Sequence, residues 1–239
     1  MNPPGIASRI FPTAEEWNLR NAVLSERMAE LIGANLPAGA SAGVEVGCQQ
    51  GALTDAMARL TPVPEWVGVD PVLTAEDRSP GGHRLLPGRA NALGFPDASF
   101  DVVLFANVYE HVPPPERTSS LAEMFRVLRP GGLIVGQLPN PWFPIESHSR
   151  LPFLGWLPIG LQRRYWRLSP ARWDHDFFRV TVRHLTRTAR AAGFEIVLVR
   201  RFNYPPEVIP GVLRRAAQML ERPMRRMPWA WQFVLRRPA

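Results

Sequence analysis

The stretch that most constrains the fold is Val44–Gly51, which reads V-E-V-G-C-Q-Q-G. A short apolar strand, expected at 42–46, runs through a turn containing two glycines into an expected helix at 52–60. A strand, a tight turn and a helix in this order form the geometry in which the carboxyl edge of a parallel sheet meets a nucleotide-like ligand. Gly47 allows a sharp turn, and Glu45 is expected to face the ligand as an acceptor. Taken alone, the segment also fits an ordinary strand-to-helix turn.

An acidic residue ends the next apolar strand, expected at 66–69. Asp70 lies about 20 positions beyond the glycine turn, the spacing at which a carboxylate can accept hydrogen bonds from both hydroxyls of a ribose. The alternative is a turn or capping aspartate, but Glu45 and the glycines favour the ribose role. Residues 74–87 are rich in turn formers and are expected to form a loop with little regular structure.

Strands and helices alternate along most of the chain, which predicts a mostly parallel, doubly wound α/β sheet. Thr13–Glu16 has the pattern of a capping box and should start a helix that runs to about Asn35. The glycines of R-P-G-G at 129–132 should follow the end of a later helix. The remaining elements are expected as helices at 114–128 and 182–192 and as strands at 102–105, 133–137 and 194–199.

Composition limits the class of protein. A chain of 239 residues with 46% hydrophobic residues can bury one large core. Its single cysteine, Cys48, excludes an internal disulfide and favours a reducing compartment. No run of about 18 uncharged apolar residues occurs, and residues 1–12 lack the pattern of a secretory signal. We therefore expect a cytoplasmic protein.

Charge is unevenly placed along the chain. Residues 163–239 carry 17 arginines and 5 acidic residues, whereas residues 1–162 carry 11 arginines and 16 acidic residues, and the chain contains no lysine. A basic C-terminal third suggests an anionic substrate, a phospholipid surface or nucleic acid as a partner.

Four blocks in order resemble a known family. They are V-E-V-G-C-Q-Q-G, V-G-V-D-P, F-P-D-A-S-F-D-V-V-L-F-A-N-V-Y-E-H-V and V-L-R-P-G-G, which together span about residues 40–140. Any one block is weak, but the ordered set is similar to the class I S-adenosylmethionine-dependent methyltransferases. The similarity is to the branch that includes many small-molecule and lipid-pathway enzymes.

The resemblance implies a Rossmann-like sheet of seven strands, with the last strand, at 229–237, antiparallel and a lid insertion after strand five. It implies one methyltransferase domain over residues 1–239. Within that domain we expect an N-terminal helix at 13–36, a cofactor-binding core at 42–137, a lid or substrate insertion at 138–181, and a C-terminal helix with strands six and seven at 182–239.

The resemblance also implies S-adenosyl-L-methionine as the cofactor. Its methionine part would lie by the glycine turn, its ribose by Asp70, and its adenine by residues 90–92. The residues expected to bind it are Glu45, Gly47, Cys48, Gln49, Gly51, Asp70, Pro71, Ala90, Asn91, Ala92, Asn107 and His111.

Two positions depart from the family pattern. Gln49 stands where the family usually has a glycine, so the approach of the backbone to the cofactor is expected to be tighter there. Arg89 stands where an aspartate usually accepts from the adenine amino group, and arginine cannot accept a hydrogen bond. Asn91 or a backbone carbonyl must then take that role. These departures keep open a catalytically degenerate relative that binds a ligand or a partner.

The segment 138–181 is dense in proline and aromatic residues and is expected to form a lid or a substrate wall. Glu146 and His148 are the preferred candidates for a general base, with His111 third. For His148, a surface or packing histidine is an equal alternative. Asp174–Asp176 are adjacent residues that cannot easily converge on one ion, so no metal is expected.

The expected activity is methyl transfer to a small-molecule acceptor, at an oxygen of a sugar, polyketide or lipid-linked intermediate. Residues 208–220 have an amphipathic pattern with arginines around it, which suits a packed connector whose arginines also touch an anionic membrane surface. Nucleic acid is not expected as a substrate, because N-V-Y-E-H stands where nucleic-acid methyltransferases have an N-P-P-Y-type block. The sequence does not indicate an oligomeric state.

Overall fold

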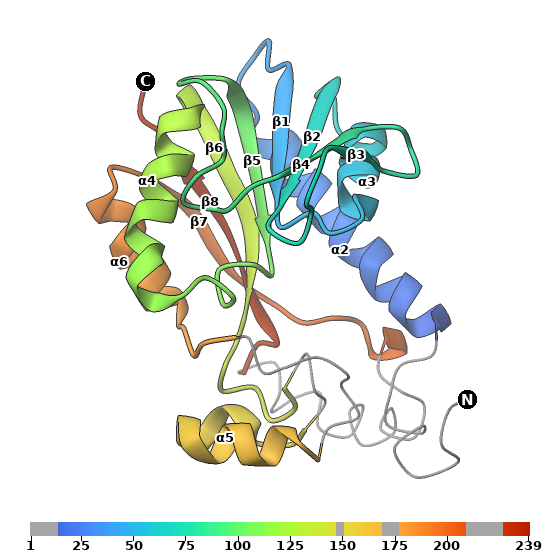
Figure 1. Ribbon diagram of the computed structural model, residues 1–239, viewed down its shortest axis with the longest axis vertical. Helices are drawn as coiled ribbons and strands as arrows, with labels where there is room; N and C mark the ends of the chain where they lie inside the picture. Colours follow the sequence, from blue (N-terminus) through green and yellow to red (C-terminus); the bar gives the residue numbers. More distant parts are fainter. Residues whose placement is uncertain (1–13, 147–150, 169–176, 209–226) are drawn as a thin grey trace.

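A computed structural model describes residues 14–146, 151–168, 177–208 and 227–239. In this part of the chain, eight strands form one sheet in the order β3-β4-β2-β1-β5-β6-β8-β7. Helices cover both faces of the sheet (Figure 1), as the alternating pattern predicts. The strands are β1 Ala42–Val46, β2 Glu65–Asp70, β3 Asp77–Arg78, β4 Arg84–Pro87, β5 Phe100–Ala106, β6 Leu128–Pro139, β7 Glu195–Phe202 and β8 Ala230–Arg236.

The strands in the middle of the sheet run parallel. β1 pairs in parallel with β2 and β5, and β4 and β6 extend this parallel set on either side. β8 lies antiparallel between β6 and β7, which confirms the antiparallel strand expected near residue 230. The carboxyl ends of the parallel strands therefore meet at one edge of the sheet.

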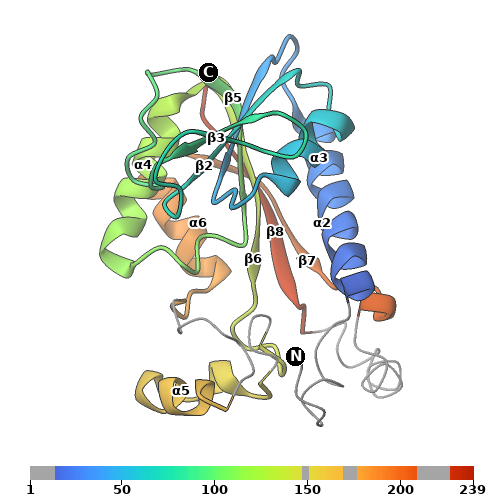
Figure 2. The same ribbon diagram turned by 45° about the vertical axis from the view of Figure 1, so that its right-hand side comes forward.

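Two helical layers enclose the sheet, as Figure 2 shows. On one face, α2 and α3 cover a cluster that includes Val102, Leu104 and Leu133. On the other face, α4 and α6 cover a cluster that includes Val103, Phe105 and Ile134. Both faces of β5 are thus buried, as its near-continuous apolar run predicts. The α-helices are α2 Ala14–Asn35, α3 Ala52–Leu60, α4 Arg117–Val127, α5 Ile159–Trp166 and α6 Val182–Ala191, and the short 3₁₀ turns are η1 Pro114–Glu116, η2 Leu154–Trp156 and η3 Pro206–Val208.

The prediction of a loop at 74–87 is wrong for its second half. β4 pairs in parallel with β2 from Gly68↔Leu85 to Asp70↔Pro87, and the two-residue β3 pairs with it. Leu85 is 1% exposed. The turn-rich composition of this segment gave no sign that Leu85 would be buried in a strand. β3 also raises the strand count from the expected seven to eight.

The R-P-G-G block was also misplaced. We expected it to lie between a helix and a strand that begins at Leu133, but β6 begins at Leu128 and contains the whole block. A bulge lies here, because Phe100 pairs with Leu128 while Val102 pairs with Leu133. Gly131 takes a φ of +80° inside this bulge, so its conformational freedom serves a strand irregularity instead of a helix end.

A separate layer lies beyond the carboxyl ends of the parallel strands. Both views place α5 there, at the bottom of the molecule (Figures 1 and 2). This layer falls within the expected lid. No helix in the described part of the chain has both the length and the apolar character needed to cross a membrane. Most of the amphipathic stretch predicted at 208–220 lies outside the described part of the chain.

Candidate functional site

The turn after β1 is held by backbone hydrogen bonds. The amide of Gly47 donates to the carbonyl of Val69 over 2.7 Å, and the amide of Gly51 donates to the carbonyl of Cys48 over 2.8 Å. Gly47 has a φ of +82°, and a Cβ there would lie 2.5 Å from Cγ2 of Val108. A glycine is therefore required both by the turn and by the close approach of the segment after β5.

Asp70 lies at the end of β2 and ties two loops together. Its Oδ2 accepts from the amide of Gln49 over 2.7 Å, and its Oδ1 accepts from the amide of Val72 over 2.9 Å. The side chain is 4% exposed. A carboxylate has about four lone-pair sites, so each oxygen keeps capacity for one more donor such as a ribose hydroxyl.

Gln49, the first departure from the family pattern, preserves the geometry of the turn. It adopts a φ of +49°, the left-handed conformation that a glycine would provide, and its own backbone amide makes the bond to Asp70. Its side chain is exposed to solvent. The substitution therefore places backbone strain in the turn without removing the hydrogen-bond donor.

Glu45 is a buried carboxyl next to this turn. It accepts from the hydroxyl of Thr54 on α3 and is 5% exposed. Burial raises the pKa of Glu45 to about 7, and the negative charges of Asp70 and Asp55 add to the increase. Burial also raises the pKa of Cys48 to about 12, so this thiol stays protonated and is a small apolar neighbour of the turn.

The second departure, Arg89, is turned toward an acidic partner. Its guanidinium lies 3.5 Å from Oε2 of Glu116 in η1, and Nδ2 of Asn91 donates to the same oxygen over 3.2 Å. With its amide nitrogen engaged there, Asn91 presents Oδ1 as an acceptor. Ala92 closes the turn, because its amide and the carbonyl of Arg89 form a hydrogen bond of 2.9 Å.

Asn107 follows β5 and joins a row of buried amides. It has a φ of +58°, and its Oδ1 accepts from Nε2 of Gln137 over 3.1 Å. The same nitrogen donates to the hydroxyl of Tyr204 over 3.0 Å. Nε2 of Gln232 then donates to Oε1 of Gln137 over 3.3 Å. His111 is half-buried in the next turn, where its amide donates to the carbonyl of Val108 over 2.8 Å.

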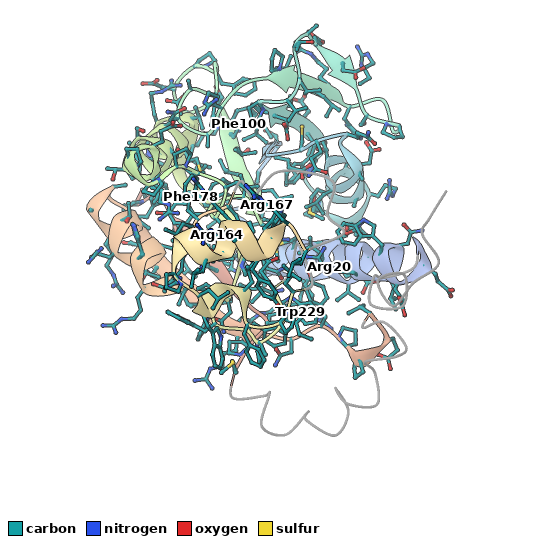
Figure 3. The ribbon with its side chains drawn as sticks, turned by 60° about the horizontal axis from the view of Figure 1, so that its bottom comes forward. Arg20, Phe100, Arg164, Arg167, Phe178 and Trp229 are labelled. Carbon is teal, nitrogen blue, oxygen red and sulfur yellow. The ribbon has the colours of Figure 1, made fainter. Side chains whose placement is uncertain are left out.

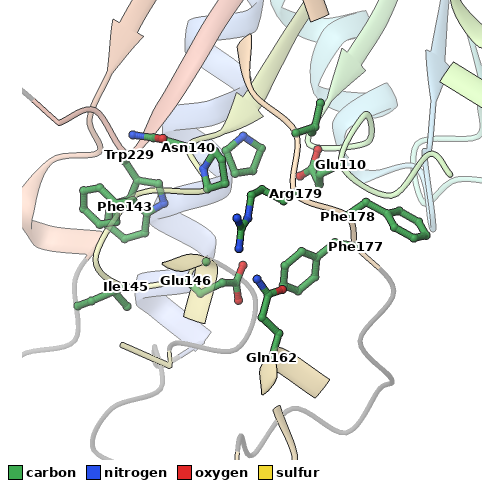
Figure 4. A pocket seen from close by; sticks show the side chains of 14 residues that line it. Glu110, Asn140, Phe143, Ile145, Glu146, Gln162, Phe177, Phe178, Arg179 and Trp229 are labelled. Atoms are coloured by element: carbon green, nitrogen blue, oxygen red, sulfur yellow. The ribbon is translucent and has the colours of Figure 1, made fainter. Parts of the chain in front are cut away.

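A pocket lies between the ends of β5 and β6 and the layer that carries α5 (Figure 4). Phe143 and Trp229 stack at one side with ring centroids 4.9 Å apart. Figure 4 shows the side chains of Arg179, Glu146 and Gln162 pointing toward one another at the centre. The pocket is lined by Glu110, Pro139, Asn140, Pro141, Phe143, Ile145, Glu146, Gly155, Gln162, Phe177, Phe178, Arg179, Val180 and Trp229.

One of the three predicted base candidates lines this pocket. Glu146 lines the pocket. His111 does not line it, but its neighbour Glu110 does. His148 and Asp174–Asp176 lie outside the described residues. Within the described residues, no cluster of three or more histidine, cysteine or acidic side chains could hold a metal ion.

The sequence prediction missed several polar residues of the pocket. Glu110 was part of a block used only to identify the family, and Gln162 and Arg179 carry no local motif. They meet because η2, α5 and residues 177–180 fold back over the end of β6, where the amide of Phe178 donates to the carbonyl of Glu110 over 2.7 Å.

The groups at the carboxyl edge of β1 and β2 fit S-adenosylmethionine. Asp70 offers the paired oxygens that ribose hydroxyls require, and Asn91 offers an acceptor for the adenine amino group. The carboxyl groups of Asp70 and Asp55 lie close enough to Glu45 to interact with it, and negative charge at this edge favours the sulfonium and ammonium charges of the cofactor. The described residues of the predicted cofactor set thus converge on one edge of the sheet.

Comparisons with known proteins agree with this geometry. Residues 44–136 match the model of a methyltransferase domain family. The chain is 44% identical over 147 residues to an uncharacterized methyltransferase of Mycobacterium marinum, covering 58% of this chain and 57% of that protein. It is 57% identical over 116 residues to one of Mycobacterium avium, covering 47% and 45%. The chain thus spans about half the length of these curated relatives.

The fold is also similar to a solved structure from Burkholderia thailandensis, 1,6-didemethyltoxoflavin-N1-methyltransferase with bound 1,6-didemethyltoxoflavin and S-adenosylhomocysteine. The TM-score is 0.54 at 16% identity, over 100% of this chain and 93% of that one. Together with the four sequence blocks and the edge built around Asp70, these matches agree with the resemblance to the class I S-adenosylmethionine-dependent methyltransferases.

Proposed function

We propose that this chain transfers a methyl group from S-adenosylmethionine to an oxygen of a small-molecule acceptor, such as a sugar, a polyketide or a lipid-linked intermediate. The observation that carries the proposal is the pocket beyond β5 and β6, where aromatic walls enclose Glu146 and Glu110. The pocket lies at the same edge of the sheet as Asp70 and Glu45. Ligands of open α/β sheets bind at this edge.

The pocket offers both kinds of contact that an acceptor with an apolar body and polar groups needs. The stacked rings of Phe143 and Trp229 present an apolar wall. Gln162 is 2% exposed, and its Nε2 donates to the carbonyl of Leu157 over 2.7 Å, so its carbonyl oxygen remains an acceptor. Such a mixture of apolar lining and a few convergent polar groups is typical of small-molecule sites.

The residues of the chain supply alignment and a proton acceptor. Bound S-adenosylmethionine supplies an electrophilic methyl group on its sulfonium. The carboxylate of Glu146 would accept the proton of the acceptor hydroxyl as the oxygen forms its bond to carbon. Arg179, toward which Glu146 points in Figure 4, would orient that carboxylate. Alignment of the two reactants is the larger contribution in a reaction of this kind.

Asn91 is proposed to replace the missing aspartate at the adenine. Its amide nitrogen is bound to Glu116, so its oxygen can accept from the adenine amino group. Arg89 then acts only through its ion pair with Glu116. The departure at Arg89 is thereby compatible with cofactor binding.

The test is incubation of the protein with methyl-labelled S-adenosylmethionine and fractionated sugar, lipid and polyketide extracts, followed by mass spectrometry of labelled products. We expect one product class to gain a methyl group. Glu146→Gln should lower kcat while binding of S-adenosylhomocysteine stays unchanged. The matched control is Glu65→Gln, because Glu65 is exposed at the opposite, amino end of β2.

The same experiment distinguishes the transfer reaction from the alternative of a degenerate relative, which would bind a ligand without transferring a methyl group. If calorimetry shows cofactor binding but no fraction becomes labelled, the binding protein is supported. Loss of cofactor binding altogether would contradict both the transfer reaction and the assigned role of Asp70.

A further inference from the structure

Exposed large apolar side chains are concentrated in the segment of the chain that carries η2 and α5. Of the eleven exposed large hydrophobic residues in the described chain, six fall between positions 142 and 168. The other five are distributed over α2, α3, β7 and the loop after β2. Scattered apolar residues are normal on a protein surface, but a cluster marks an interaction site. We call this surface the lid face, and its residues are Trp142, Phe153, Trp156, Ile159, Leu161 and Leu168.

The lid face is held outward by a fixed scaffold. Nε1 of Trp156 donates to the carbonyl of Trp142 over 2.9 Å, and the ring of Phe153 lies 5.0 Å from that of Trp156. The guanidinium of Arg179 donates to the carbonyl of Leu157 over 2.5 Å and lies 5.0 Å from the ring of Trp142. These contacts fix the backbone beneath the exposed rings.

The backbone of Phe153 adds to this argument. Its φ of +56° is in the left-handed region, which costs energy for a bulky residue, yet its side chain remains 50% exposed. On α5, Gln162 and Trp166 lie one turn apart and are both buried, so that face of the helix packs inward. The opposite sides of α5 are therefore presented to the surroundings.

The charge of this segment is of one sign. Arg163, Arg164 and Arg167 are all exposed, and residues 151–168 contain no aspartate or glutamate. Figure 3 shows Arg164 on α5 and Arg167 just after its end, in front of the carboxyl end of the sheet. A partner that binds the lid face must therefore have both an apolar interior that accepts the exposed side chains and a negative charge that pairs with the arginines.

We propose that the lid face docks on an anionic lipid bilayer. Exposed tryptophan and leucine side chains insert at the level of the headgroups, and arginines beside them bind lipid phosphates while their stems lie along apolar surface. The inference does not depend on the proposed function, because docking requires neither cofactor nor methyl transfer. Its failure would leave the transfer reaction untouched.

The lid face lies next to the pocket. Gly155 and Gln162 line the pocket, while their neighbours Trp156 and Leu161 belong to the lid face. Docking would thus place the pocket beside the bilayer surface, where an acceptor held in the membrane is accessible.

The test is sedimentation of the full chain with vesicles of phosphatidylglycerol and phosphatidylcholine, compared with vesicles of phosphatidylcholine alone. We expect binding to the anionic vesicles that weakens with added salt. Each surface arginine contributes roughly fivefold to such binding, so Arg163→Gln/Arg164→Gln should weaken it roughly 30-fold. The control with the same change in net charge is Arg59→Gln/Arg78→Gln, because both residues are exposed on the α3 and β3 side of the molecule.

A second matched pair tests the apolar contact. Leu161 and Leu60 are both 49% exposed, but Leu60 lies at the end of α3, far from the lid face. Leu161→Ser should weaken vesicle binding by about fivefold to tenfold, by the loss of buried methylene groups, and Leu60→Ser should leave it unchanged. Binding of S-adenosylhomocysteine by each variant checks that the fold is intact.

Three outcomes would overturn the proposal. The first is a wild-type chain that stays in the supernatant with anionic vesicles at low salt. The second is an equal loss of binding in the control variants, which would indicate attraction by net charge alone. The third is a wild-type dimer in the absence of vesicles that Leu161→Ser converts to a monomer, which would make the lid face a contact between copies of this chain.

Discussion

The edge proposed to bind the cofactor (the cofactor edge) and the pocket proposed to bind the acceptor lie at the same end of the sheet but are held in different ways. At the cofactor edge, Asp70 accepts from the amides of Gln49 and Val72, so the site is fixed by backbone groups close to the ends of β1 and β2. In the pocket, Glu110 and Arg179 come from distant segments that are joined by the lid layer. The cofactor edge therefore depends on two tight turns, and the pocket depends on packing of the lid.

The largest expected effect is at the cofactor edge. Asp70→Ala removes both backbone contacts and the proposed ribose acceptor, and hydrogen bonds to a charged group contribute about 1.5–3 kcal/mol each. Affinity for S-adenosylhomocysteine, measured by calorimetry, should fall at least about 100-fold. Asp77→Ala, at an exposed aspartate of β3, is the control. A loss of less than about threefold would place the ribose elsewhere.

The next effect is a dependence of stability on pH. The folded-state pKa of Glu45 is about 7, above its ordinary 4.5, so the folded protein binds more protons than the unfolded chain between these values. The free energy of unfolding of the wild type should therefore fall as pH rises from 4.5 through 7, by about 3 kcal/mol from this group. Glu45→Gln cannot ionise, and it should gain stability relative to the wild type across this window.

Urea denaturation at pH 5 and pH 8 measures this difference. The wild type and Glu45→Gln should differ most at the higher pH. Parallel curves for the two proteins would show that Glu45 ionises in the folded state as readily as in the unfolded chain.

A smaller effect tests the lid side of the comparison. A Cβ at Gly155 would lie 1.8 Å from the carbonyl oxygen of Pro141, so Gly155→Ala should destabilise the pocket by about 2 kcal/mol through overpacking. Limited proteolysis within the lid should then accelerate while cofactor affinity is retained. In Gly160→Ala the new Cβ meets nothing within 4 Å, and alanine favours the helix α5. Equal proteolysis of both variants would contradict the packing argument.

The smallest effect concerns Gln49. Its φ of +49° is strained for a side chain such as that of glutamine, so Gln49→Gly should raise the free energy of unfolding by about 0.5 kcal/mol. Cofactor affinity should stay the same, because the amide of residue 49 still donates to Asp70. Gln50→Gly, at an exposed position without a positive φ, should instead lower stability. Affinity that rises with Gln49→Gly would show that the side chain obstructs the cofactor.

The difference between the two regions explains how far the sequence could predict them. The bounds of β1 and α3 were correct, because the glycine turn between them has a short-range pattern. β4 was missed because its role depends on burial of Leu85 against β2, which no local pattern shows. The start of β6 at Leu128 was missed for a similar reason, since the bulge opposite β5 allows two glycines inside a strand.

The residues of the candidate site also differ in how far the sequence could predict them. Asp70 was identified from its spacing to the glycine turn and Glu45 from its place in the strand before that turn, and both side chains lie beside the turn in the structure. Glu146 was expected in the pocket because it belongs to the lid. Gln162 and Arg179 could not be expected, because each is an ordinary polar residue until the fold of the lid brings them together.

The position of β8 has a consequence for assembly of the protein. β8 is the last described strand in the sequence, yet it lies between β6 and β7, and β7 pairs with β8 alone among the described strands. Until residues 230–236 are synthesised, β7 lacks a strand partner and β6 presents an open edge. The correct insertion is specified by Gln137, Gln232 and Arg200, which share one register row and bond side chain to side chain. A slip of one residue would direct Gln232 to the opposite face of the sheet, so this row selects the register with which β8 inserts between β6 and β7.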